Sequence, residues 1–243
     1  MHNSSLVLDP AFINPVTNEI LYPESDGQPI AENTTQYNLL TMLHSNIDAL
    51  FAERDDVFCA SDLFWYPVEG MPTIRLAPDV MLVLGRPRGD RPSYLQWKED
   101  NLPPNLVIEI ISPGNTPSEM MDKLEFYDRF GVQEYYTFDP HKQKFNAWHR
   151  HNGHLQYLYG QEQWYSPILD VTFALEDPEQ SPCYGLIVQR ADGTRFETVR
   201  EMRRKWREEQ LQSQREKQRA EQEKQRADAL AEKLRALGIN PDE

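Results

Sequence analysis

The sequence has few cysteines, no long apolar run and no excess of positive charge. Its two cysteines, Cys59 and Cys183, leave room for one bridge at most, so neither a disulfide framework nor a four-thiolate zinc site is expected. Across 243 residues, 25 Lys+Arg against 39 Asp+Glu give a net charge of -14, which excludes an overall basic sheath for nucleic acid. The most apolar stretch, residues 106–111, is far too short to cross a bilayer, and no basic segment precedes an apolar core at the N-terminus. We therefore expect a cytoplasmic protein with no membrane partner.

Composition divides the chain near residue 200. Residues 1–200 hold 14 basic and 29 acidic side chains, whereas residues 201–243 hold 11 and 10 and have no glycine until Gly238. A heptad that starts at Val199 places apolar residues at eight of its twelve a and d positions, with a polar middle. The sequence therefore predicts a globular domain over 1–200 and a charged heptad helix over 201–243. That helix is either an oligomerisation tail, self-associating through residues 199–237, or a solvated helix without a partner.

Local signals in the first 200 residues alternate between helix and strand. Thr116-Pro117-Ser118-Glu119 matches a capping box, and Gly131 is a typical helix stop. Asn152-Gly153 is the dipeptide that a type I′ hairpin turn prefers. We predict helices over 34–52 and 117–130, strands over 57–66, 73–84, 105–112 and 134–138, a hairpin over 144–151 and 154–159, and short strands over 168–199. This order indicates an α/β fold with a mixed central sheet.

Glu109 is the first candidate for chemistry, because it interrupts an otherwise apolar strand. Its two neighbours on either side are all Ile or Val, and a strand of that composition is usually covered on both faces. A carboxylate there must be neutralised, paired or bound to a cation, since burying it bare costs several kcal/mol. Such a conflict is typical of a functional site, and a sheet-edge position or a structural ion pair is the alternative.

Asp79 is the second candidate, and its significance depends on whether its strand pairs with the strand of Glu109. It follows Pro78 and opens the apolar stretch 80–84, where an acid alone would be ordinary turn chemistry. Sequential strands often pair, and pairing with the Glu109 strand would bring the two carboxylates together. With a backbone carbonyl of Ile110 or Ile111, they would offer the oxygen ligands that Mg²⁺ prefers.

Lys123 is the third candidate. On the capped helix it shares a stripe with Met120, Tyr127 and Phe130, so it borders the packed face. The helix directly follows the Glu109 strand, and its first turns should lie near the end of that strand. Two acids, one metal ion and one ammonium group are the parts that a phosphodiester hydrolase needs. An isolated lysine at such a position would more ordinarily extend to solvent.

The order and spacing of these residues resemble the Uma family of predicted restriction endonucleases, a cyanobacterial type within the PD-(D/E)XK nuclease superfamily. The likeness covers roughly residues 20–175 and is carried by three segments: Pro78-Asp79-Val80, Val107-Ile-Glu-Ile-Ile-Ser-Pro113, and Lys123 to Pro140 with its Tyr127, Gly131, Glu134, Tyr135 and Asp139. The resemblance implies the restriction-endonuclease-like fold, a mixed sheet flanked by helices with acids on adjoining strands and Mg²⁺ between them. It implies Asp79 and Glu109 as metal ligands and Lys123 as the catalytic lysine.

This sequence departs from the wider superfamily at Ile111, where the usual motif has a lysine two residues after the acid. Lys123 would substitute for that lysine. The superfamily often adds an acid from the first helix. Here Glu32 and Glu53 flank that helix, and Asp62 is a further candidate as an outer acid.

Substrate binding is predicted for the polar loop 85–98. It carries Arg86, Arg88, Arg91 and Lys98 with interleaved aromatic residues and leaves the strand that Asp79 opens, so it could hold a phosphate backbone. A solvated loop with its arginines paired to nearby acids is the alternative.

These residues together predict an endonuclease that hydrolyses DNA with Mg²⁺, or with Mn²⁺ in its place. The rival hypothesis is a catalytically silent binding or assembly protein that keeps the nuclease fold and acts through its C-terminal helix.

Overall fold

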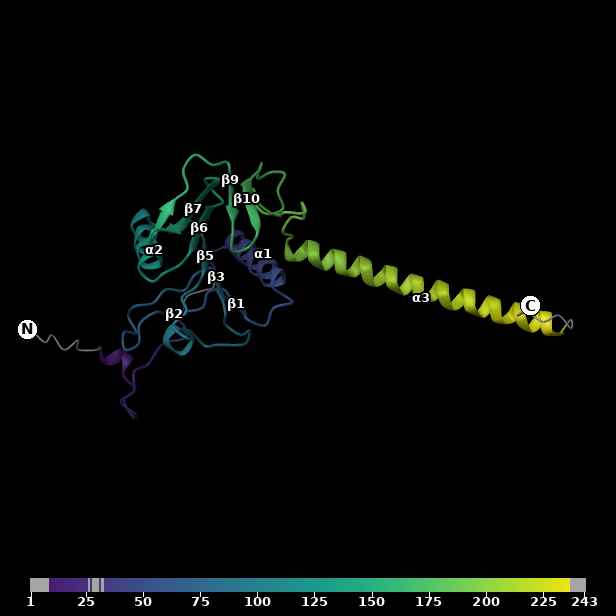
Figure 1. Ribbon diagram of the computed structural model, residues 1–243, viewed down its shortest axis with the longest axis horizontal. Helices are drawn as coiled ribbons and strands as arrows, with labels where there is room; N and C mark the ends of the chain where they lie inside the picture. Colours follow the sequence, from purple (N-terminus) through teal and green to yellow (C-terminus); the bar gives the residue numbers. More distant parts are fainter. Residues whose placement is uncertain (1–8, 26, 28–30, 32, 237–243) are drawn as a thin grey trace, which may run out of the picture. The chain divides into compact units, whose positions relative to one another are not determined.

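A computed structural model describes residues 9–25, 27, 31 and 33–236, and it divides the chain into two compact units, residues 1–198 and 199–243. The described part of the second unit is one helix, α3 (Val199–Ala236). The first unit contains two α-helices, two short 3₁₀ helices and eleven strands among its described residues (Figure 1). In chain order these are η1 (Pro10–Phe12), α1 (Thr34–Leu50), β1 (Val57–Ala60), β2 (Trp65–Tyr66), β3 (Val80–Leu84), β4 (Tyr94–Leu95), η2 (Gln96–Lys98), β5 (Leu106–Ile110), α2 (Pro117–Arg129), β6 (Glu134–Asp139), β7 (Lys144–His151), β8 (His154–Tyr157), β9 (Gln163–Ser166), β10 (Val171–Leu175) and β11 (Leu186–Arg190).

The central sheet of the first unit has six strands in the order β1-β3-β5-β6-β7-β8. Strands β5 and β6 are parallel, with α2 as their crossover, and every other neighbouring pair is antiparallel. β9, β10 and β11 form a separate antiparallel sheet, and β2 pairs with β4. The predicted mixed α/β fold is therefore confirmed.

Two predicted strands are shorter than the apolar pattern suggested. The run 57–66 divides into β1 and β2 because Asp62 takes a left-handed backbone conformation, with φ of 50°. Of the run 73–84, only the last five residues form β3. Pro78 has no N–H to donate to a sheet ladder, so the strand begins after it. Asp79 consequently stands at the entrance of β3.

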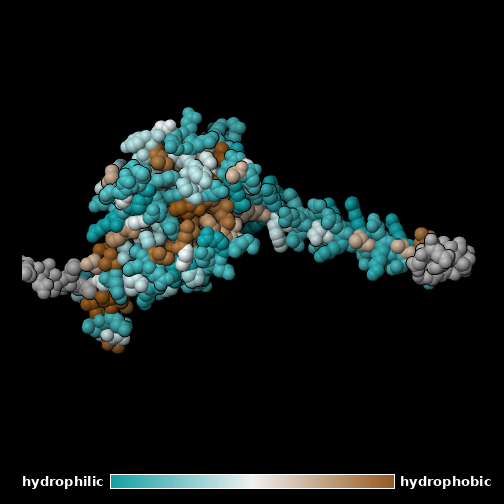
Figure 2. Space-filling model, in the orientation of Figure 1, coloured by the Kyte–Doolittle hydropathy of each residue, from teal (hydrophilic) through white to brown (hydrophobic). Residues whose placement is uncertain are grey.

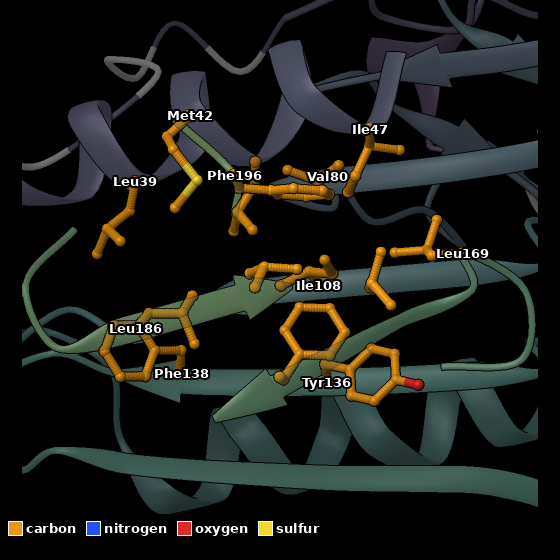
Figure 3. Close-up of a cluster of buried hydrophobic side chains, with 14 of the residues drawn as sticks. Leu39, Met42, Ile47, Val80, Ile108, Tyr136, Phe138, Leu169, Leu186 and Phe196 are labelled. Carbon is orange, nitrogen blue, oxygen red and sulfur yellow. The ribbon is translucent and has the colours of Figure 1, made fainter. Parts of the chain in front are cut away.

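Hydrophobic packing covers both faces of the central sheet. On one face, α1 packs against β3, β5 and β6, together with the sheet of β9 to β11. Figure 3 shows side chains of this core, such as Leu39, Ile108 and Phe138, pointing toward one another from these elements. On the opposite face, Tyr127 of α2 packs with Val107 of β5 and with other residues of a second core. β5 thus has no solvent-exposed face, as its composition predicted.

Local contacts fix α2 against the sheet. Thr116 and Glu119 form the predicted capping box at its start. Gly131 follows its end with a φ of +94°, a conformation that glycine adopts without strain. Arg150 of β7 donates to the backbone carbonyls of Tyr127 and Asp128, the last turn of the helix. The side chains on the sheet-facing side of α2 are therefore held in register with β5 and β6.

The helix α3 includes residues 201–236 of the predicted charged tail, and residues 237–243 lie outside the described residues. Its surface is mostly hydrophilic in Figure 2, with exposed apolar side chains such as Trp206, which is 64% exposed, and Leu230. Self-association through this helix stays a prediction. Within the described residues, no helix combines the length and the apolar character that a membrane span requires.

Candidate active site

Glu109 is a buried carboxylate held by two donors from α2. Its residue is 2% exposed. The Lys123 ammonium donates to its Oε2 at 2.7 Å, and the Tyr127 hydroxyl donates to its Oε1 at 2.5 Å. Lys123 and Tyr127 are four residues apart, so they share one face of the helix. The structure thus brings together Glu109 and Lys123, as the sequence predicted, and adds Tyr127 as a partner.

The charge of Lys123 is stabilised by the acids around it. Its side chain is 24% exposed, and burial by itself would favour the neutral amine. The charge and hydrogen bond of Glu109, with the charge of Asp79, outweigh that effect and raise the pKa of Lys123 above its ordinary value. Burial and the Glu109 charge also raise the pKa of Tyr127 well above 10, so its hydroxyl remains a donor.

Asp79 approaches this pair from the neighbouring strand. The antiparallel ladder between β3 and β5 aligns Val80 with Ile108, which places Asp79 beside Glu109. Its Oδ2 accepts a 2.6 Å hydrogen bond from the backbone N–H of Ile110. The carboxylate thereby replaces the acceptor that a longer β3 would have offered. This bond orients Asp79 toward the end of β5.

The site holds two carboxyl groups and one ammonium group. Burial, followed by the nearby charge of Glu109, raises the pKa of Asp79 to about 8, although the Ile110 hydrogen bond and Lys123 act in the opposite direction. Asp62 is close enough to raise it further. Two carboxylates facing one ammonium would accommodate an additional cation, which would favour the ionised form of Asp79.

The donor set fits a magnesium ion that keeps several waters. Across the described ranges, no group of three or more His, Cys, Asp or Glu residues could hold a metal ion. Two carboxylates and a backbone carbonyl nevertheless suffice for Mg²⁺, which binds few protein ligands and dehydrates reluctantly. Each carboxylate oxygen of Glu109 keeps a second lone pair besides the one that Lys123 or Tyr127 uses. Asp79, Glu109 and the carbonyl of Ile110 are the residues that could hold the ion.

The first helix contributes an amide where an acid was expected. Gln36 of α1 donates from Nε2 to the Ile110 carbonyl at 3.4 Å. Glu53 is exposed beyond the C-terminal end of α1, and Glu32 lies outside the described residues. No local pattern in the sequence distinguishes Gln36, because its contact spans 74 residues.

Lys123 can be reached from solvent through a pocket of about 480 Å³. The pocket is lined by Leu76, Gly114, Asn115, Glu119, Asp122, Lys123 and Phe126. The loop before α2 and the first turns of the helix form most of this opening. A substrate group of moderate size could therefore approach the ammonium without displacing the core.

The predicted substrate loop lies elsewhere. It begins after Leu84, the last residue of β3, whereas Asp79 precedes the first residue of that strand. Arg86 and Arg91 both bind Glu99, Arg86 also binds Asp100, and Arg88 binds Asp48 at the C-terminal end of α1. These pairs tie the loop to the far end of the sheet. Phosphate binding by these arginines or by the exposed Lys98 stays a prediction.

Two comparisons with known proteins found similar proteins. A family model described as Uma2, "Putative restriction endonuclease", matches residues 16–176, a range that includes all three site residues. A solved structure of a "putative nuclease belonging to DUF820" from Anabaena variabilis ATCC 29413 is also similar, at 13% identity and a TM-score of 0.42 over 60% of this chain and 81% of that one. No curated protein matches the sequence. Since the family match covers well over half of the chain, the protein belongs to the Uma2 family.

Proposed function

We propose that the protein is a metal-dependent endonuclease that hydrolyses phosphodiester bonds in DNA, with Mg²⁺ as its ion and Mn²⁺ as a substitute. The observation that carries the proposal is the 2.7 Å contact between Lys123 and Glu109, buried beside Asp79. A structural ion pair would not require a second acid buried beside it. The family assignment supports a nuclease in general, and the geometry of the site supports the roles proposed for Asp79, Glu109 and Lys123.

Asp79 and Glu109 would hold the ion, with the Ile110 carbonyl as a third oxygen. A bound Mg²⁺ supplies Lewis acidity, which polarises a phosphate oxygen and lowers the pKa of a coordinated water. The backbone N–H of Ile110 keeps Asp79 oriented, and the Tyr127 hydroxyl keeps Glu109 oriented. Both acids are therefore preorganised before substrate arrives.

Lys123 would act on the attacking water and on the phosphate. Its ammonium remains charged at neutral pH because the two acids raise its pKa. From that position it can orient the water and stabilise the negative charge that develops on the phosphate oxygens. The pocket in front of Lys123 gives the scissile phosphate a route to it.

The test is nicking of supercoiled plasmid by the purified full chain with Mg²⁺, with Mn²⁺ and with EDTA. We expect nicking with either ion and none with EDTA. Asp79→Asn, Glu109→Gln and Lys123→Met should each reduce the rate by at least about 100-fold, within the range of general acid–base or electrostatic catalysis. Glu125→Gln, an exposed change on the same helix, is the matched control and should keep the full rate.

The outcomes separate this proposal from the rival hypothesis of a silent scaffold. Circular dichroism must show that each variant is folded. If folded Glu109→Gln nicks DNA at the full rate, the assignment of the site is wrong. If the unaltered chain neither nicks DNA nor shows saturable Mn²⁺ binding by calorimetry, the scaffold hypothesis replaces the proposal.

A further inference from the structure

A second pocket, of about 340 Å³, lies on the other side of the loop that precedes α2. Asn115 lines both this pocket and the opening to Lys123, so the two hollows are neighbours. The sheet side is built by β6 and β7, and the helix side by Met120, Met121 and Leu124. Its volume is at the lower end of the range for ligand pockets, about 300–1,000 Å³, which suits one small planar ligand.

Three cross-strand pairs on β6 and β7 form the floor of the pocket, and their polarity changes along its length. In register these pairs are Tyr135 with Trp148, Thr137 with Asn146, and Asp139 with Lys144. Side chains two residues apart on a strand share one face, so all six belong to the α2 side of the sheet. The floor therefore changes from aromatic through neutral polar to charged along its length.

The aromatic end of the pocket is built from packed rings. The Trp148 ring is stacked on Tyr135 at a centroid distance of 5.0 Å and also contacts Tyr157. Tyr135 is fully buried, and among the described residues its hydroxyl has no hydrogen-bond partner.

The middle of the floor offers both donors and acceptors. The Asn146 amide donates to the Thr137 hydroxyl at 2.9 Å and accepts from the Tyr157 hydroxyl at 3.1 Å. The second N–H of Asn146, the second lone pair of its oxygen and the proton of Thr137 remain available to a ligand. An asparagine amide that can donate and accept at once matches the edge of a nucleobase, adenine above all.

The charged end is suited to a phosphate. Lys142 is 77% exposed and forms a 3.1 Å ion pair with Asp139, and Lys144 is exposed beside it. Two ammonium groups against one carboxylate leave a net positive charge at this end. A nucleotide could thus place its base over Trp148 and Asn146 and its phosphate near the lysines.

We propose that this pocket binds one unpaired nucleobase of a nucleic-acid strand, together with the phosphate that adjoins it. The inference rests on the proposed function for its ligand class, because a nuclease must engage a polynucleotide. A base inside a duplex cannot reach such a pocket, so the ligand is a single-stranded or extrahelical nucleotide. A strand whose base occupies the pocket would pass beside the opening to Lys123.

The experiment is calorimetric titration of the full chain with dAMP in EDTA, with deoxyadenosine and inorganic phosphate as comparison ligands. We expect saturable binding of one dAMP. Asn146→Leu should weaken it by about tenfold, and Lys144→Ala should weaken dAMP but not deoxyadenosine. Arg129→Ala, an exposed charge on the far end of α2, is the matched control and should change nothing. Because Asn146→Leu removes two internal hydrogen bonds, Met121→Glu at an exposed position provides a second variant, and its new charge should repel the phosphate.

Three results would overturn the proposal: no saturable dAMP binding, equal affinity in every variant, or inorganic phosphate binding as tightly as dAMP. Glu109→Gln separates this proposal from the proposed function. That variant should bind dAMP as the unaltered chain does while losing nicking. Nicking without dAMP binding would refute the base pocket alone, and dAMP binding without nicking would refute the metal-dependent reaction alone.

Discussion

Replacing Lys123 by methionine should lower the stability of the protein far more than replacing Glu109 by glutamine. The Glu109 side chain is 3% exposed, and after loss of Lys123 its charge would keep only the Tyr127 hydroxyl as a hydrogen-bond donor. Glu109→Gln, in contrast, leaves an ammonium that can extend to solvent, and it removes a like charge from the neighbourhood of Asp79.

The expected magnitudes follow from the burial of each partner. Removing one partner of a buried ion pair costs about 3–5 kcal/mol. Because Lys123 lies at the solvent-exposed edge of the site, we expect Lys123→Met to lower the free energy of unfolding by about 2 kcal/mol. Glu109→Gln should change the free energy of unfolding by less than about 1 kcal/mol.

Urea unfolding at pH 7.5, followed by near-ultraviolet circular dichroism, measures these free energies from the packing of the aromatic core. The double variant Glu109→Gln/Lys123→Met completes a double-mutant cycle. It should recover most of the stability lost in Lys123→Met, since Glu109 no longer carries a buried, unpaired charge. If Lys123→Met is as stable as the unaltered chain, Glu109 does not depend on the ammonium. If the double variant is the least stable of the three, a different contact of Lys123 is responsible.

Three further predictions concern other parts of the molecule. Burial opposes the ionisation of Asp128, but the hydrogen bonds from His154 and from a backbone N–H hold its pKa below the ordinary value of 3.8. The ionised carboxylate therefore stabilises the fold above pH 3.8, and this stabilisation is lost as the pH falls through the lowered pKa. Asp128→Asn should therefore cost about 1 kcal/mol at pH 7 in urea unfolding, and progressively less below pH 4. Gly131→Ala should cost about 1–2 kcal/mol by the same measurement, because its φ is +94° and the new methyl group would touch Pro103 at 3.4 Å. Removing residues 199–243 should leave a folded monomer, whereas light scattering of the full chain should give a higher-order mass if the heptads self-associate.

Local chemistry made much of this fold predictable from the sequence. The capping box and its glycine stop bound α2, and the Asn152-Gly153 turn sets the hairpin of β7 and β8, because each signal acts within a few residues. The strand predicted over 73–84 was too long, since hydrophobicity alone does not reveal that Pro78 prevents the hydrogen-bond ladder of β3 from extending further.

Long-range contacts were harder to foresee. Pairing of β3 with β5 was a topological expectation, and it correctly brought Asp79 to Glu109. The loop 85–98 was expected beside the site, but the direction of β3 carries it to the opposite end of the sheet. Gln36 was missed because nothing within its own helix marks its contact with Ile110. Residues that meet through local periodicity were therefore predicted better than those that meet through chain direction.

The position of the lysine can itself be tested by moving it. Side chains alternate along a strand, so Ile111 follows Glu109 on the α2 side of the sheet, where it lines the pocket beside Asn115. A lysine at 111 and one at 123 would thus extend into neighbouring pockets that share Asn115, one from the end of β5 and one from the helix that covers it. What matters on this reasoning is the face that the ammonium occupies, not its place in the chain.

The double variant Ile111→Lys/Lys123→Met should therefore nick plasmid at least tenfold faster than Lys123→Met alone, although more slowly than the unaltered chain. The shortfall is expected because Lys123 is held by α2, whereas a lysine at 111 would have no such support. Ile111→Lys by itself is the control, and it should retain nicking because Lys123 is still present. A folded double variant that nicks no faster than Lys123→Met would show that the helix supplies more than an ammonium group on the correct face of the sheet.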